Sequence, residues 1–154
     1  MKANARTTQI SSTQAQRILE RDCHRCVACG RRIEGARRSR WDVHLRIPRP
    51  APGQPDDPRV LADSNLVTIC GVNGTRCSGL IREYPAAARA RGLVLWRTDR
   101  PWLTPVQVWT DRFSGHLLDD EGTVPYVLDD DGGRATVAVQ GRRITSVAEF
   151  LGAS

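Results

Sequence analysis

Four cysteines stand in two pairs whose types and spacing suit a metal site. Cys26 and Cys29 form a Cys-x2-Cys turn, and Cys70 and Cys77 follow about forty residues later. One such turn presents two thiolates from a single knuckle, and a second pair completes a tetrahedron around zinc. We therefore expect these four residues to hold a structural Zn²⁺, the alternative being that they are unrelated free thiols.

The fifth cysteine, Cys23, offers a competing ligand pair, because Cys23 and Cys26 are also separated by two residues. Cys23 falls at the end of a predicted helix, so we interpret it as the spare thiol. The N-terminal segment has no apolar run behind Lys2 and Arg6, so no secretory signal is predicted and a cytoplasmic location is expected. Clustered cysteines in that reducing setting are more often metal ligands than disulfides.

Positive charge is concentrated near the N-terminus. The first 50 residues carry 12 Lys or Arg against 4 Asp or Glu, whereas the remainder carries 11 against 13. All but Lys2 are arginine, whose planar guanidinium binds two phosphate oxygens at once. This asymmetry indicates a polyanionic partner, most simply DNA, with RNA as the alternative, although an arginine-rich composition alone would give similar counts. No window approaches the roughly 18 apolar residues of a membrane span, so no membrane partner is expected.

Hydrophobic periodicity places these residues on short elements. A helix is predicted over 13–22, with a capping box at Thr13 and Gln16. Strict alternation over 41–47 predicts a half-buried strand, with His44 and Arg46 on its polar face. The other predicted elements are a proline-rich loop at 48–58, a strand at 66–70, helices at 78–84 and 85–91, β-prone segments at 93–96, 106–110, 124–128 and 135–139, and hairpin turns at 119–122 and 129–132.

These elements predict an α+β fold in three parts. Residues 1–11 are polar and expected to be disordered, 12–92 form a small zinc-stapled domain, and 93–154 form a β-rich appendage of unassigned role. With aromatic residues at only 5% of the chain, the core is expected to be thin, and a small thin core needs a metal staple.

Taken together, four segments resemble the HNH endonuclease superfamily, particularly the small zinc-knuckle HNH proteins encoded by phages of actinobacteria. They are the cysteine turn at 21–30, the strand at 42–48, the segment 65–70 and the helix that follows Cys77. The resemblance spans roughly residues 13–91. It implies a ββα-metal domain that cleaves DNA phosphodiesters in the cytoplasm of a bacterium, or of the host if the gene belongs to a phage.

In such a site a strand brings a metal ligand and a general base, an Asn steadies the loop, and the helix adds ligands to a divalent ion such as Mg²⁺. The match is partial. His44 occupies the strand's ligand position and Asn65 the position of the Asn, with Pro48 fixing the register. The general-base position is Leu45, and the helix ligand positions are Ser78 and Arg82.

These replacements predict weak or absent cleavage, because loss of a general base alone lowers the rate about 10²–10⁴-fold. Two rescues stay open: His24 or His116 could enter the site, or His44 could act as the base with other ligands. Arg82 could instead supply the positive charge of the missing ion.

Three functions therefore fit the sequence: an HNH DNA endonuclease, a non-cleaving descendant that keeps the zinc and binds nucleic acid, and a protein-interaction module that uses the acidic tail. The first is favoured as the family, and the second as the activity. The arginines expected to bind phosphate are Arg37, Arg38, Arg40, Arg46, Arg49 and Arg82.

Overall fold

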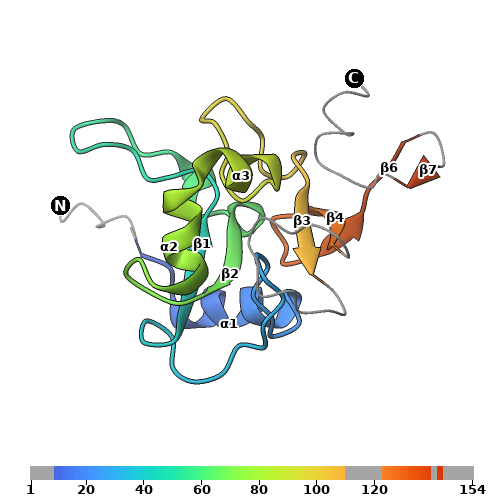
Figure 1. Ribbon diagram of the computed structural model, residues 1–154. Coiled ribbons are helices and arrows are strands. Elements are labelled where there is room, and N and C mark those ends of the chain that lie inside the picture. The colour runs from blue at the N-terminus through green and yellow to red at the C-terminus, as the bar shows by residue number, and fades with distance from the viewer. Residues whose placement is uncertain (1–8, 110–122, 140–141, 144–154) are drawn as a thin grey trace.

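The computed structural model describes residues 9–109, 123–139 and 142–143. It confirms a mixed α+β fold. In Figure 1, α1 lies below the β1–β2 sheet, α2 lies in front of that sheet, and β3 and β4 stand beside it. The elements are α1 (Ser12–Arg21), β1 (Trp41–Leu45), η1 (Pro58–Leu61), η2 (Asp63–Asn65), β2 (Leu66–Cys70), α2 (Arg76–Glu83), α3 (Pro85–Ala90), β3 (Val106–Trp109), β4 (Thr123–Leu128), β5 (Arg134–Thr136), β6 (Ala138–Val139) and β7 (Arg142–Arg143).

Helix α1 begins earlier than the sequence pattern predicts. Its N-cap is Ser11, whose hydroxyl accepts a hydrogen bond from the Gln14 amide at 3.1 Å. The predicted capping box at Thr13 is therefore wrong, because Ser11 already satisfies an amide of the first turn. The helix buries Ile18 and Leu19 against the core.

Strands β1 and β2 form an antiparallel pair, in which Trp41 lies opposite Cys70 and Leu45 opposite Leu66. The predicted alternation ends at Leu45, because beyond it the chain bonds to Asn65 instead of to a strand. The Arg46 amide donates to the Asn65 carbonyl at 2.9 Å, and the Ile47 amide donates to its side-chain oxygen at 2.7 Å. Strand β2 is buried at every position and contacts both α1 and α2.

The described part of the C-terminal region packs on the same core as the helices. Leu93, Val106, Val108 and Leu128 belong to the buried cluster that contains the cysteines. Strands β3, β4 and β5 form an antiparallel sheet, and the predicted turn at 129–132 joins β4 to β5. The predicted strand at 93–96 is wrong, because this segment is irregular. Its Leu95 amide donates a hydrogen bond to the carbonyl of Arg46, the residue that follows β1, at 2.8 Å. The predicted turn at 119–122 and His116 lie outside the described residues.

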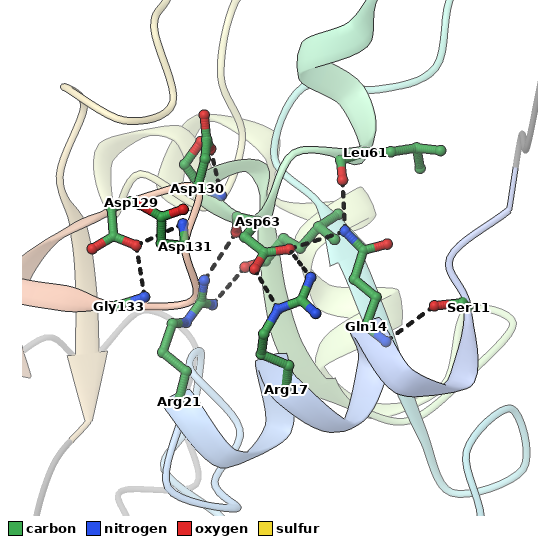
Figure 2. A network of polar contacts seen from close by, with 12 residues as sticks. Ser11, Gln14, Arg17, Arg21, Leu61, Asp63, Asp129, Asp130, Asp131 and Gly133 are labelled. Carbon is green, nitrogen blue, oxygen red and sulfur yellow. Dashed lines mark hydrogen bonds and ion pairs between the residues drawn. The ribbon is translucent and has the colours of Figure 1, made fainter.

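A buried carboxylate, Asp63, joins α1 to the segment before β2 (Figure 2). Its two oxygens accept from the Arg17 guanidinium at 2.7 and 2.8 Å, and one also accepts from the Gln14 amide group at 3.0 Å. The next residue, Ser64, donates its amide to Asp130 in the β4–β5 turn at 3.2 Å. This network therefore connects three separate parts of the fold.

Replacement of Asp63 by Asn is expected to lower the free energy of unfolding at pH 7 by about 1–3 kcal/mol, since charge-assisted hydrogen bonds are lost. Burial raises the pKa of Asp63, but the bonds from Arg17 and Gln14 hold it below its usual value. Its contribution is thus complete above the unfolded pKa of about 3.9 and is lost as the pH falls through the folded pKa. Urea unfolding at pH 7 and pH 3 tests this, and a gap between the variant and wild type that stays constant would contradict it.

Candidate metal centre and the adjoining cleft

Cys26, Cys29, Cys70 and Cys77 meet at one buried point. The first two lie in the turn after α1, Cys70 ends β2, and Cys77 lies in the first turn of α2. Their sulfur atoms all lie within 4.8 Å of one another. The predicted grouping is therefore confirmed, and these residues could hold a metal ion.

The sulfur spacing fits metal ligation better than a disulfide. Cys29 Sγ and Cys70 Sγ are 3.8 Å apart. A disulfide requires about 2.05 Å, whereas the edge of a tetrahedron with metal–sulfur bonds of about 2.3 Å is close to 3.8 Å. The donor set and its spacing thus suit a closed, tetrahedral structural site.

The pKa values of the cysteine thiols differ, because hydrogen bonds within the group and burial act on them in opposite directions. The Cys26 thiol, together with the Arg31 amide, holds the pKa of Cys29 below its usual value, and the same kind of contact from Cys26 lowers the pKa of Cys70. Burial raises the pKa of Cys26. Because a metal binds the thiolate form, a divalent cation would release the remaining thiol protons.

The two loops that carry the cysteines are held firmly. The Val27 amide donates to the Thr68 carbonyl of β2 at 2.9 Å, which fixes the first knuckle to the sheet. Gly71 has φ 84°, and a Cβ there would lie 2.2 Å from the Thr75 carbonyl oxygen. Only glycine therefore allows the tight turn that returns Cys77 to Cys70.

Cys23 lies outside this group, as predicted. It is exposed, and its sulfur is 3.1 Å from a guanidinium nitrogen of Arg134. Cys23→Ser is therefore expected to retain a full complement of metal and an unchanged melting temperature. Metal per chain, measured by plasma emission spectroscopy, checks this, and loss of the metal would show that Cys23 is a ligand.

A cleft of about 420 Å³ adjoins the cysteine group between β1, β2 and the start of α2. It contains two of the positions that the resemblance identifies, His44 and Ser78, and also Asp42, which sequence reasoning did not assign. Its lining consists of Arg38, Asp42, Val43, His44, Ile69, Gly71, Val72, Asn73 and Ser78.

The other positions taken from the resemblance lie elsewhere. Asn65 is fully buried, and its side-chain amide donates to the Ile47 and Val60 carbonyls at 3.1 and 3.0 Å, so it steadies the loop after β1. Leu45 packs against the hydrophobic core. Arg82 is exposed on α2, outside the lining of the cleft.

No family model, curated protein or solved structure matches this chain. Within the part of the chain that the structure describes, no helix combines the length and apolar character needed to cross a bilayer. The HNH resemblance rests on the motif residues of the chain itself.

His44 is fixed as a neutral imidazole. Its Nε2 lies 2.7 Å from the Leu93 carbonyl oxygen, which can only accept, so Nε2 carries the proton and Nδ1 keeps a lone pair. Burial lowers the pKa of His44 below 6.5; the Leu93 carbonyl opposes this shift and the Arg46 cation adds to it. Metal-binding and basic histidines are oriented by a backbone carbonyl in the same way.

NMR titration of His44 is expected to give a pKa below 6.5, with the proton on Nε2 in the neutral form. Because the unfolded chain takes up this proton first, the stability contribution of neutral His44 is complete above about pH 6.5. It is lost as the pH falls toward the folded pKa. A measured pKa above 6.5 would contradict the proposed burial of a neutral ring.

One of the predicted phosphate-binding arginines is wrongly assigned. Arg46 is fully buried, and its guanidinium donates to backbone carbonyls only, so it cannot reach a ligand. Those carbonyls belong to Gly92, Ser64, Pro101, Thr104 and Pro105, at 2.7, 3.0, 3.1, 2.6 and 3.2 Å. Burial lowers the pKa of Arg46 to about 9, which still leaves it a cation at neutral pH.

The remaining predicted arginines keep access to solvent. Arg37 is half-buried and pairs with Asp42 at 2.8 Å. The exposed ones are Arg38, Arg40, Arg49 and Arg82. Sequence reasoning missed Arg31, Arg32 and Arg76, which join Arg40 in a second cleft. The available signal was their position within three residues of Cys29 or Cys77.

Proposed function

We propose that this chain is an HNH-like, zinc-stapled protein that binds DNA over the cleft framed by β1, β2 and α2, with weak or no phosphodiester cleavage. The observation that carries the proposal is the convergence of the four cysteines. It fixes the start of α2 against the end of β2, so that two strands and one helix enclose His44 and Ser78 beside the exposed Arg38.

Zinc is the proposed metal because zinc prefers closed sites of four thiolates. The four sulfurs lie within 4.8 Å of one another, and the pair Cys29–Cys70 is at the 3.8 Å edge of a zinc tetrahedron. Iron also takes tetrahedral thiolate sites. Metal analysis of the purified protein distinguishes the two metals. A colourless protein with one zinc per chain supports the proposal, whereas bound iron with visible absorption would show that the structural metal is iron and not zinc.

Weak cleavage is proposed because the cleft has ligand groups but a poor set of reacting groups. Asp42 and the neutral His44 offer an oxygen and a nitrogen to a divalent ion. Ser78 contributes only a hydroxyl, and Leu45 has no exchangeable proton. His44 would have to serve as ligand and base at once, which one imidazole nitrogen cannot do.

Binding is tested by fluorescence anisotropy with a labelled 20-base-pair duplex over a range of salt concentrations. Micromolar or tighter binding that weakens steeply with salt supports the proposal, since phosphate contacts release counterions. An otherwise equal RNA duplex identifies the preferred nucleic acid. Absence of binding to either at low salt would overturn the proposal.

Cleavage is tested by incubating supercoiled plasmid with the protein in Mg²⁺, Mn²⁺ or Ni²⁺, with a chelator control and the His44→Ala variant in parallel. No nicking is expected from a protein with its full zinc complement. Chelator-sensitive nicking that His44→Ala abolishes would show a working nuclease and overturn the non-cleaving part of the proposal.

A protein partner is the second candidate, favoured by three exposed apolar side chains near the start of the tail. Trp96 is 58% exposed, Trp102 37% and Leu103 51%. Capture of a partner that survives nuclease treatment and fails with Trp96→Ser would favour this function over DNA binding.

A further inference from the structure

A second cleft, of about 380 Å³, lies directly against the metal centre, since Cys70 forms part of its wall. Four arginines and one carboxylate line it: Arg31, Arg32, Arg40, Arg76 and Glu34. The formal charge of this lining is strongly positive. The cleft is therefore concave and positively charged, and metal binding by the cysteines does not account for its arginines.

Most of this charge is not neutralised within the fold. Among the described residues, the ion pairs use Arg17, Arg21, Arg37 and Arg59. Arg32, Arg40 and Arg76 are exposed and have no carboxylate within ion-pair distance in the part of the chain that the structure describes. Their guanidinium groups thus stay available to an external anion.

The loops that carry these arginines are fixed before any ligand arrives. Gly35 has φ 85°, and a Cβ there would lie 2.7 Å from Cγ of Arg40, so the Arg40 stem lies across the glycine. The Trp41 indole donates to the Gly35 carbonyl at 3.0 Å, and the Gly71 amide donates to the Arg40 carbonyl at 2.9 Å. A preorganised cation site loses less entropy on binding than a flexible one.

Arg76 occupies a backbone conformation that glycine adopts more easily than arginine. It opens α2 with φ 49°, a left-handed conformation that is unfavourable for residues with a Cβ. Glycines do occupy the positive-φ positions 71 and 74 of the same turn. Backbone strain retained at a long cationic side chain that lines a positively charged cleft indicates a role for that side chain.

We infer that this cleft is a phosphate-binding site that takes a phosphodiester group of a nucleic-acid backbone. Arginine suits that ligand because its donors match the phosphate oxygens in pairs. The choice of a nucleic-acid backbone rests on the proposed function; a free di- or triphosphate presents the same chemistry. The site would set the position of the nucleic acid relative to the β1–β2–α2 cleft without reading its sequence.

The test compares two double variants that remove the same charge. Arg40→Gln with Arg76→Gln alters the cleft, and Arg97→Gln with Arg100→Gln removes two exposed arginines of another loop. Anisotropy with the labelled duplex gives the slope of log affinity against log salt. The cleft variant is expected to reduce the magnitude of that slope by about 2, near 0.9 per lost phosphate contact, and the control to leave it nearly unchanged. Equal reductions in both would overturn the inference.

Arg76→Gly separates a binding role from a structural one. It removes the guanidinium and relieves the left-handed strain, so the melting temperature is expected to stay the same or rise while DNA affinity falls severalfold. Unchanged affinity would remove Arg76 from the site, and a lower melting temperature with unchanged affinity would make its role structural.

Calorimetry with inorganic pyrophosphate distinguishes failure of this inference from failure of the proposed function. Pyrophosphate binding that needs Arg40 and Arg76, without DNA or RNA binding, would keep the phosphate site and reject the nucleic-acid backbone as its ligand. DNA binding with equal slopes in both double variants would reject the site and keep the function. Absence of binding to all these ligands would reject both.

Discussion

A Cys77→Ser variant is expected to lose its metal and its folded structure together. Binding of a structural zinc ion is worth about 10–16 kcal/mol in small zinc domains, which is as large as the roughly 5–15 kcal/mol by which whole domains are stable. Cys77 is buried and contributes one of four converging sulfur atoms, so serine would leave an incomplete site inside the core. Metal content and circular dichroism against temperature measure the two losses.

The matched control is Cys23→Ser, which makes the same chemical change at the exposed cysteine. Chelation of the wild-type protein is expected to reproduce the Cys77→Ser result, and zinc added afterwards should restore the fold. A Cys77→Ser protein that melts cooperatively near the wild-type temperature would show that the metal is dispensable for folding.

Replacement of Arg46 by Met is expected to destabilise the protein by on the order of 4 kcal/mol or more. Methionine fills much of the same volume but leaves five backbone carbonyls without a donor, and each buried unsatisfied group costs about 1–3 kcal/mol. Urea unfolding gives the free energy. Hydrogen exchange should show protection lost first in the segment 92–105.

Arg49→Met is the control, because Arg49 is exposed three residues along the chain and surface changes usually stay within about 0.5 kcal/mol. Arg46→Lys is expected to fall between the two, since a single ammonium group cannot reach all the carbonyls that the guanidinium spans. An Arg46→Met variant as stable as Arg49→Met would show that the carbonyl contacts contribute little.

The sequence predicted the features that depend on local spacing. Two cysteine pairs, the alternation of β1 and the apolar run of β2 each carry a pattern that a single chain displays without its partners. The pairing of Cys26 and Cys29 with Cys70 and Cys77, and the rejection of Cys23, followed from such patterns and the position of a helix end.

The sequence could not predict features that depend on irregular backbone. Alternation assigned Arg46 to the solvent side of a strand. Four of its five carbonyl partners lie more than forty residues further along the chain, in irregular backbone that no side-chain pattern records. The second cleft could not be predicted from the sequence for the same reason, because irregular loops form it. Arg31, Arg40 and Arg76 come together because their three loops meet around the four clustered cysteines, not because of their spacing in the chain.

Two of the buried arginines, Arg46 and Arg91, also set an order of events during synthesis. The four candidate metal ligands end at Cys77, so they leave the ribosome before the last carbonyl partners of these arginines and could take up a metal first. The last carbonyl partner of Arg46 along the chain is Pro105. Arg91 donates to the Ala28 and Gln107 carbonyls, so its last partner is made later still. We therefore expect a stage of synthesis in which the four cysteines are available to a metal while two guanidinium groups still face water. Emergence of the region around β3 then supplies the last carbonyl partners of both arginines.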